Sequence, residues 1–391
     1  MLIFIYVITD LLSNFILWRL TTGAKPLIRY AAIGFNILLT CFTVLFAIKY
    51  WLHGNHYATP IGIMDNLHMN LGLFVTILPR TILVIMHFTG AIFKLSSKSY
   101  IRGLSLTGMV IWALIIYMGA SGYFIGRFNF RYEEVTIHIP DLHPDLEGFR
   151  IVQISDLHLG SFHGSPEKIT EMVSMVNDLQ PDMILNTGDF ITFGHREYGN
   201  FDTILLKMNS KYGNYAILGN HDIGTYLRGA TEEDIQTTMT NVSRSVVESG
   251  YTLLNRSNDI ICVGASKLAI IGAETRGRHP QMIHPRLEEA VKGTIDADLR
   301  ILMTHDPNHW DQVIADAPGI ELTLSGHTHG MQFGYIGKNV KWSPSKYFYP
   351  RWYGLFTSGD MNLYVNRGLG VLGIPVRFGM PPEITILILR R

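Results

Sequence analysis

The sequence is poor in cysteine and in charge. Only two of its 391 residues are cysteines, Cys41 and Cys262, and their wide separation predicts no disulfide framework. Charged residues make up 16% of the chain and hydrophobic residues 47%, which is apolar for a soluble protein and indicates a membrane part. No segment repeats at a fixed period and none is low in complexity, which argues against a repeat architecture.

Charge is scarcest in the first 126 residues, where four long apolar runs follow one another. They cover approximately residues 2–18, 31–51, 71–93 and 104–125. Each run is close to the ~20 residues that a helix needs to cross a bilayer. We therefore predict a transmembrane domain of four helices over residues 1–126 and a second domain over residues 127–391. No basic region precedes the first run, so a cleaved signal peptide is not predicted.

The basic residues between the runs predict the orientation in the membrane. The first connection carries Arg19, Lys25 and Arg29, and the third carries Lys94, Lys98 and Arg102. The second connection, over residues 54–66, carries no basic residue. Because basic loops stay in the cytoplasm, we predict an integral protein of the plasma or inner membrane, with residues 127–391 on the extracytoplasmic face. Arg127 and Arg131 count against this orientation.

Two charges of opposite sign lie inside apolar runs. Asp10 and Arg80 each lie about nine residues into a run that enters from the same side. At ~1.5 Å per residue both should lie ~14 Å deep. Charges within a bilayer usually pair, so we predict an Asp10–Arg80 pair. It is either a structural clamp or a means for Arg80 to approach a lipid phosphate.

The second half of the chain has an α/β pattern and an acidic balance. From residue 127 onward there are 24 Lys and Arg against 30 Asp and Glu, a net charge of −6 that argues against a nucleic-acid partner. Short apolar runs alternate with helical patterns, which predicts a layered α/β domain. The first strands are predicted at residues 151–155, 183–187, 215–218, 301–304 and 322–325, with an edge strand at 135–139 and later strands at 251–254, 260–263, 268–271, 362–366 and 384–389.

Residues that bind metals follow five of these strands. They are Asp156 and His158; Asp189; Asn220 and His221; His305; and His327 with His329. The carboxyl ends of strands are where α/β sheets form their sites. A set of oxygen and nitrogen ligands without thiolate suits Mn, Zn or Fe. It is too large for one ion, so we predict two divalent ions about 3.5–4 Å apart that hold a phosphoryl group and activate a water to attack it as hydroxide.

The order Asp-x-His, Gly-Asp, Gly-Asn-His-Asp, His and Gly-His-x-His resembles the calcineurin-like metallophosphoesterase family. The segments at 345–347, 366–370 and 378–384 resemble its membrane-tethered branch. The resemblance implies a two-sheet β-sandwich flanked by helices. It also implies that one metal is held by Asp156, His158, Asp189 and His329, that the other is held by Asp189, Asn220, His305 and His327, and that His221 protonates the leaving oxygen.

The residue chemistry agrees with these roles. Only a carboxylate such as Asp189 has two oxygens that can span two cations. His221 follows Asn220 directly, and neighbours in an extended backbone point in different directions, so His221 can act as an acid beside the metals. Asp222 is either a partner that orients His221 or a residue that caps the backbone.

The segment over residues 333–356 is rich in aromatic and basic residues, including Trp342 and Trp352. Such residues are typical of a membrane interface. Because the segment directly follows His327 and His329, it either borders the active site and faces the bilayer or is a packed cap.

We therefore expect a membrane-anchored, metal-dependent phosphoric ester hydrolase, a phosphodiesterase or phosphomonoesterase, that cleaves a phosphate ester or anhydride. Membrane anchoring favours a membrane lipid or lipid-linked phosphate as its substrate. If the domain is cytoplasmic, a nucleotide-linked glycolipid pyrophosphatase is the alternative. A non-catalytic membrane scaffold with a structural metal site is a second alternative, and it predicts an incomplete ligand set.

Overall fold

The protein is described by a computed structural model that covers residues 2–53, 59–93, 100–227, 229–273, 287–317, 319–338 and 340–391. The chain forms two compact units, each built from more than one segment. The first comprises residues 1–54, 65–125 and 373–376, and the second comprises residues 55–64, 126–372 and 377–391.

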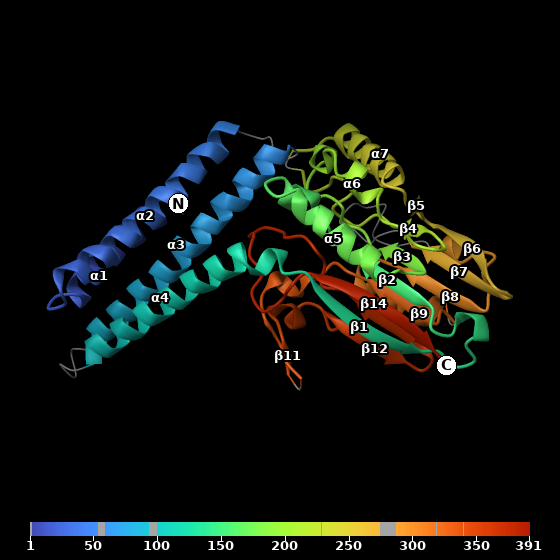
Figure 1. Cartoon of the computed structure of the whole chain (residues 1–391). Coiled ribbons are helices and arrows are strands. Elements are labelled where there is room, and N and C mark those ends of the chain that lie inside the picture. The colour runs from blue at the N-terminus through green and yellow to red at the C-terminus, as the bar shows by residue number, and fades with distance from the viewer. Residues whose placement is uncertain are drawn as a thin grey trace. The chain divides into compact units, whose positions relative to one another are not determined.

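Four long helices make up the N-terminal part of the chain (Figure 1). They are α1 (Leu2–Leu20), α2 (Pro26–His53), α3 (Pro60–Phe93) and α4 (Tyr100–Phe124). Among the described residues, three helices are long and apolar enough to cross a membrane: Pro26–Leu52, Pro60–Phe93 and Gly103–Phe128. The four predicted helices all form, but α1 is not among the candidate spans of the described residues, so the predicted number of spans is off by one there.

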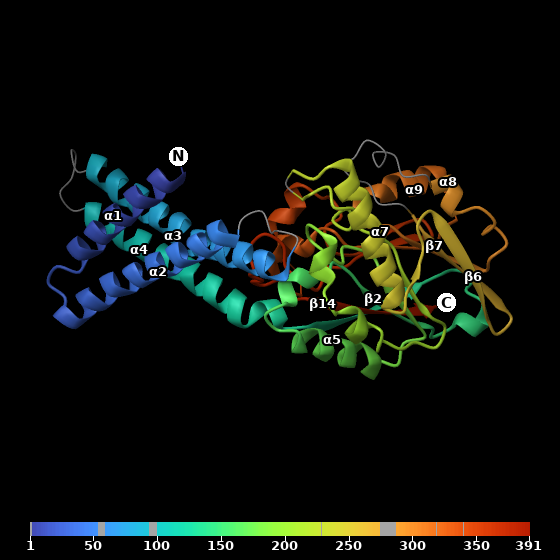
Figure 2. The ribbon, with the colours of Figure 1, turned by 90° about the horizontal axis from the view of Figure 1, so that it is seen from above.

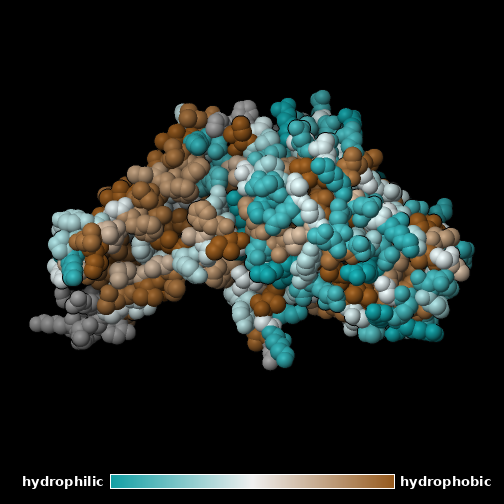
Figure 3. Space-filling view, in the orientation of Figure 1, coloured by the Kyte–Doolittle hydropathy of each residue, from teal (hydrophilic) through white to brown (hydrophobic). Residues whose placement is uncertain are grey.

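Apolar side chains cover the outside of these helices (Figure 3). Leu27 is 80% exposed and Trp51 is 77% exposed. In water such a surface would be strongly unfavourable, whereas lipid solvates it. These helices therefore associate the chain with a membrane. Lys94 and Lys98 of the predicted third connection, and residues 54–58 of the second, lie outside the described residues.

The predicted pair of Asp10 and Arg80 is confirmed. The guanidinium of Arg80 is fully buried and lies 3.1 Å from the Asp10 carboxylate. It also donates hydrogen bonds to the Asn36 carbonyl at 2.8 Å and to the Thr40 hydroxyl at 2.7 Å. Because these partners surround the charge, the contacts favour the structural clamp over an approach to lipid phosphate.

The second unit contains two six-stranded sheets (Figure 1). The first has the order β1-β14-β2-β3-β4-β5 and the second the order β12-β13-β9-β8-β7-β6. The first sheet is built from β1 (Arg131–His138), β14 (Glu383–Arg390), β2 (Arg150–Ile154), β3 (Met183–Asn186), β4 (Asn214–Ala216) and β5 (Thr252–Leu253). The second is built from β12 (Gly354–Ser358), β13 (Met361–Val365), β9 (Leu322–Ser325), β8 (Leu299–Met303), β7 (Ser266–Gly272) and β6 (Ser257–Val263). All the predicted strands form, and β1 is an edge strand as predicted.

Alternating side chains build a sandwich between the two sheets. Ile151 and Leu185 of the first sheet share a buried cluster with Ile301 and Leu322 of the second. The opposite face of the first sheet packs against α5 (Glu167–Asp178), α6 (Asp202–Leu205) and α7 (Glu232–Glu248). The second sheet packs against α8 (Leu287–Ala290) and α9 (Trp310–Asp316) (Figure 2). The predicted α/β sandwich flanked by helices is therefore confirmed.

Candidate metal centre

The parallel strands of both sheets direct the candidate ligands to one place. β2, β3 and β4 run parallel in the first sheet, and β8 and β9 run parallel in the second. The Gln153 amide at the end of β2 donates a 2.9 Å hydrogen bond to the Ser325 carbonyl at the end of β9, which joins the two sheets at this edge. Parallel strands present their carboxyl ends on the same side, so residues that follow them in sequence converge.

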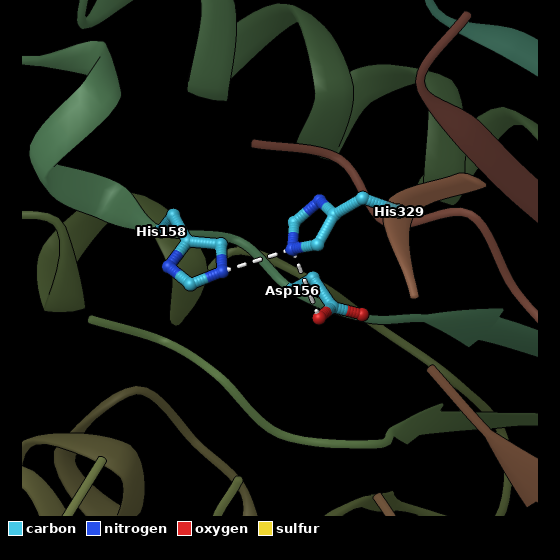
Figure 4. Close-up of side chains that lie close together, drawn as sticks. All are labelled: Asp156, His158 and His329. Carbon is cyan, nitrogen blue, oxygen red and sulfur yellow. Dashed lines mark hydrogen bonds and ion pairs between the residues drawn. The ribbon is translucent and has the colours of Figure 1, made fainter. Parts of the chain in front are cut away.

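One group of ligand atoms consists of Asp156, His158 and His329, whose ligand atoms lie within 4.8 Å of one another (Figure 4). The Nε2 atoms of His158 and His329 are 3.1 Å apart. Nε2 of His329 also lies 3.3 Å from Oδ1 of Asp156. All three residues are buried, so their ring nitrogens and carboxylate oxygen face one another away from solvent.

A second group consists of Asp189, His305 and His327, again within 4.8 Å. Nε2 of His305 lies 3.0 Å from Oδ2 of Asp189 and 3.2 Å from Nδ1 of His327. The same Oδ2 atom lies 3.8 Å from Nε2 of His158, a member of the first group. The Asp189 carboxylate therefore lies between the two groups, where a bridging ligand would have to be.

Asn220 and His221 are held beside this carboxylate. The backbone N–H of His221 donates a 2.9 Å hydrogen bond to Oδ1 of Asp189. Oδ1 of Asn220 is buried and has no hydrogen-bond partner among the described residues. A buried amide oxygen without a partner is unfavourable unless a ligand contacts it. The structure therefore places every predicted site residue at one edge of the sandwich.

The turns that carry the ligands have an unusual backbone. Asp156, His158, Asp189, His327 and His329 all have positive φ, between 40° and 74°. Residues other than glycine rarely adopt this left-handed conformation, which costs about 1–2 kcal/mol per residue. Such strain clusters at functional sites, where the surrounding structure imposes it. Here it turns each side chain sharply away from its strand.

Neighbouring oxygens fix the orientation of the imidazole rings. The Nδ1 atoms of His305 and His221 lie 2.8 Å from the Thr187 carbonyl and 2.6 Å from the Thr192 carbonyl, respectively. A carbonyl accepts only from N–H, so both Nδ1 atoms carry a proton. Nε2 is then the atom that His305 has available for a metal and His221 for a proton.

Asp222 caps the backbone of the ligand turns. Its carboxylate accepts hydrogen bonds from the backbone N–H groups of Asp189 at 2.9 Å, Ile191 at 3.1 Å and Gly219 at 2.8 Å. Of the two roles considered for Asp222, these contacts favour capping over orienting His221. Burial and the nearby Asp189 charge raise the pKa of Asp222 to about 8.

The electrostatics of the site centre on Asp189. Burial alone would raise the pKa of its carboxyl, but the charges of His305 and His221 outweigh burial and hold that pKa well below its usual value. Burial would likewise lower the pKa of His305, yet the Asp189 charge raises it to about 10. A protonated His305 thus neutralises Asp189 in the absence of a cation, and a metal that binds His305 must displace this proton.

The donor set fits divalent metal ions. It combines buried carboxylate oxygens, imidazole nitrogens and the unpartnered amide oxygen of Asn220, and it contains no thiolate. Mn, Zn and Fe accept this mixture of ligands. The fold and the candidate metal-binding groups define a metallophosphoesterase, a metal-dependent hydrolase of phosphoric esters.

Comparison with known proteins agrees with this class. Residues 149–331, which lie in the second unit, match the family model described as calcineurin-like phosphoesterase. The chain is 28% identical to the uncharacterized metallophosphoesterase YkuE of Bacillus subtilis over 76% of this chain and 98% of that protein.

Two further relatives are a transmembrane protein and a pyrophosphatase by name. The chain is 29% identical to the transmembrane protein with metallophosphoesterase domain of Danio rerio, over 66% of this chain and 57% of that protein. It is 27% identical to the UDP-2,3-diacylglucosamine pyrophosphatase LpxG of Chlamydia muridarum, over 64% of this chain and 86% of that protein.

Several residues at the site were not predicted from the sequence. Arg377 is fully buried and its Nη2 lies 3.3 Å from Nδ1 of His329. The Tyr349 hydroxyl lies 3.0 Å from Nε2 of His327, and the Tyr226 hydroxyl lies 3.0 Å from the amide nitrogen of Asn220. Arginine and tyrosine are common everywhere in sequences, so nothing in their spacing distinguishes Arg377 and Tyr226. Tyr349 lies in the aromatic segment that was expected either to border the site or to form a cap.

The aromatic segment divides into a packed part and an exposed part. Trp352 and Tyr353 are buried in a small cluster with Met380. By contrast, Tyr347 is 69% exposed and Phe348 is 68% exposed. Packing as a cap is therefore observed for part of the segment, whereas contact of the exposed part with a bilayer stays a prediction. The Tyr349 contact with His327 connects the segment to the site.

Proposed function

We propose that this protein is a membrane-anchored phosphoesterase that uses two divalent ions to hydrolyse a phosphate ester or anhydride on a lipid-type substrate. The position of Asp189 between two groups of ligands is the observation that carries this proposal. When bound, two such ions stabilise the charge on the phosphoryl oxygens and supply the attacking hydroxide near neutral pH.

The protein's own residues have distinct roles in this proposal. Asp156, His158, Asp189 and His329 would hold one ion, and Asp189, Asn220, His305 and His327 would hold the other. Nδ1 of His221 donates its hydrogen bond to the Thr192 carbonyl, so Nε2 is the atom that delivers a proton to the leaving oxygen. Asp222 keeps the turn that carries Asp189 in place.

A lipid substrate is supported by the membrane helices and by exposed side chains near the site. Tyr347 and Phe348 present large apolar surfaces, and the Lys346 ammonium lies 5.0 Å from the Tyr347 ring centre. Aromatic and basic side chains together suit the region of lipid headgroups. We propose that this exposed pair contacts the bilayer and admits a phosphate-bearing headgroup to the metals.

Metal analysis combined with a panel of substrates tests the catalytic proposal. The full chain in lipid nanodiscs should bind two Mn²⁺ ions and hydrolyse at least one of p-nitrophenyl phosphate, bis-p-nitrophenyl phosphate, a lipid phosphate or a lipid pyrophosphate. Asp189→Asn should lose metal and fall by at least about 100-fold in rate, since it removes a bridging charge. The exposed Asp296 supplies the matched control, Asp296→Asn, which should keep both. Full activity in Asp189→Asn would refute the bridging role.

Substitution of the exposed aromatic pair tests the lipid preference. Tyr347→Ser with Phe348→Ser should lower kcat/KM for a lipid phosphate in vesicles about tenfold or more, and should leave hydrolysis of p-nitrophenyl phosphate unchanged. Leu206→Ser is the control, because Leu206 is 57% exposed and lies in another part of the unit. Equal losses on both substrates would reject a role in lipid binding.

A nucleotide-linked glycolipid pyrophosphatase is the second candidate, which the similarity to LpxG favours. It requires a cytoplasmic site, whereas our proposal has an extracytoplasmic one. Cys262 in the second unit is exposed, so the two can be distinguished in a Cys41→Ser background. Labelling of Cys262 by a membrane-impermeant maleimide in intact cells would support the extracytoplasmic site. Labelling only after lysis would favour the pyrophosphatase.

A further inference from the structure

Tyr226 contacts two neighbouring site residues at once. It lies in the loop that follows β4, six residues after Asn220. Its ring is nearly parallel to the imidazole of His221, with ring centres 4.1 Å apart and planes inclined by 17°. Its hydroxyl oxygen accepts a 3.0 Å hydrogen bond from Nδ2 of Asn220. The two contacts use different parts of the tyrosine, the ring face and the hydroxyl group.

The hydroxyl contact determines which end of the Asn220 amide is used. With Nδ2 held by Tyr226, Oδ1 is left buried and without a hydrogen-bond partner among the described residues. An amide binds a cation through its oxygen and never through its NH₂ group. The orientation that Tyr226 stabilises is therefore the one in which Asn220 is able to bind a metal.

The ring contact limits the motion of His221. Its Nδ1 is tied to the Thr192 carbonyl at 2.6 Å, which fixes one edge of the imidazole but leaves the ring able to rotate about that bond. The Tyr226 ring covers one face of the His221 imidazole. The His158 ring, whose centre lies 5.1 Å away and whose plane is inclined by 81°, limits rotation of the His221 ring on another side. Stacked rings of this kind contribute orientation as well as apolar contact.

We propose that Tyr226 is a positioning residue that sets the Asn220 amide for metal binding through its hydroxyl and the His221 ring for proton transfer through its face. This inference rests on the proposed function, because it uses the roles assigned there to Asn220 and His221. It adds that Tyr226, a side chain outside the ligand motif, positions both Asn220 and His221. Its effects on these two residues can be separated by substitution.

Two substitutions separate the contacts. Tyr226→Phe removes the hydroxyl and keeps the ring, whereas Tyr226→Leu removes both. Substitution of a residue that hydrogen-bonds to a metal ligand typically lowers metal affinity by about 10–100-fold. Both variants should therefore bind the second Mn²⁺ ion at least about tenfold more weakly in calorimetric titration of the full chain in nanodiscs. Tyr212→Phe is the control, because the Tyr212 ring packs on Phe149 in the core and should leave Mn²⁺ binding unchanged.

The second readout compares two leaving groups. An alkyl phosphate needs a proton on its leaving oxygen, whereas p-nitrophenolate leaves without one, so the ratio of the two rates reports on His221. Tyr226→Leu should lower the alkyl rate about tenfold more than the aryl rate, and Tyr226→Phe should leave this ratio unchanged. A merely structural role would lower both rates and the unfolding midpoint together in both variants, which would overturn the inference.

Parallel variants separate failure of this inference from failure of the proposed function. If Asn220→Ala weakens binding of the second Mn²⁺ ion and His221→Ala changes the ratio of the alkyl rate to the aryl rate, while the Tyr226 variants do neither, only the role of Tyr226 is refuted. If Asn220→Ala and His221→Ala have no such effects, the proposed function and this inference both fail.

Discussion

Gly368 offers a sharp test of how tightly the first ligand group is held. A Cβ atom on Gly368 would lie 2.6 Å from Cβ of Asp156 and 3.2 Å from its Cγ. Ordinary contacts begin at 3.4 Å, so Gly368→Ala would have to push the base of the Asp156 side chain by about 0.8 Å. Gly368 also has a φ of 73°, so alanine there adds left-handed strain of about 1–2 kcal/mol.

The displacement of Asp156 and the backbone strain at residue 368 should appear in different measurements. A displacement close to 1 Å at a group that positions the reaction can reduce the rate by about 100-fold. We therefore expect Gly368→Ala to lower kcat for p-nitrophenyl phosphate by roughly that factor and to reduce the metal content measured by mass spectrometry. The strain alone should lower the unfolding midpoint by a few degrees, about 2–4 °C per kcal/mol for a domain of this size.

Gly359 provides the matched control. Its φ of 58° is also left-handed, but no atom of the described residues lies within 4 Å of the position that its Cβ would occupy. Gly359→Ala should therefore cost similar stability while keeping the metals and the rate. If both variants lost activity equally, or if Gly368→Ala kept full metal content and rate, the reasoning that Asp156 is a precisely held ligand would be refuted.

Two further predictions concern the membrane clamp and a buried carboxyl. Arg80→Met should destabilise the first unit by about 3 kcal/mol because it leaves the Asp10 charge unpaired, and the double variant with Asp10→Leu should be more stable than Arg80→Met alone. Additive losses, measured by heating in detergent, would exclude a coupled pair. Burial raises the pKa of Glu197 to about 7. The folded state then holds this proton more tightly than the unfolded state, so stability should fall by up to about 3 kcal/mol as the pH rises from 4.5 to 7. Glu197→Gln should flatten this dependence in chemical denaturation, and an unchanged pH slope would contradict the buried-carboxyl account.

The Glu197 carboxylate also shows how the site depends on residues beyond the ligands. It accepts hydrogen bonds from the backbone N–H groups of Thr192 at 2.7 Å and Gly194 at 2.8 Å. Thr192 in turn contacts both His158 and His221, through its hydroxyl at 3.1 Å and its carbonyl at 2.6 Å. The loop that orients two imidazoles is therefore anchored by a buried acid that binds no metal in our proposal.

Local patterns in the sequence were sufficient for the strands and for the positions of the candidate ligands. β2 was predicted from a short apolar run that ends before Asp156, and β9 from a similar run before His327. The observed strands, Arg150–Ile154 and Leu322–Ser325, agree with these predictions within one residue at each end. Such runs can be read locally because a strand buried on both faces needs apolar residues at consecutive positions.

The intramembrane pair was also accessible from sequence. Asp10 and Arg80 are isolated charges in apolar runs at similar predicted depth, and a charge in lipid needs a partner. Their hydrogen bonds to Asn36 and Thr40 were not predicted, since polar uncharged residues occur in membrane helices for many reasons.

What the sequence determined by itself was therefore the order of elements, the metal-type residues at strand ends and the class of chemistry. Only the tertiary structure decided that Asp189 lies between two groups, that Asp222 caps the backbone, that Trp352 is packed while Phe348 is exposed, and that Tyr226 contacts Asn220 and His221. The physical reason is that periodicity and turn chemistry act over a few neighbouring residues. Contacts between distant loops depend instead on how two sheets pack and on the left-handed turns at their edge.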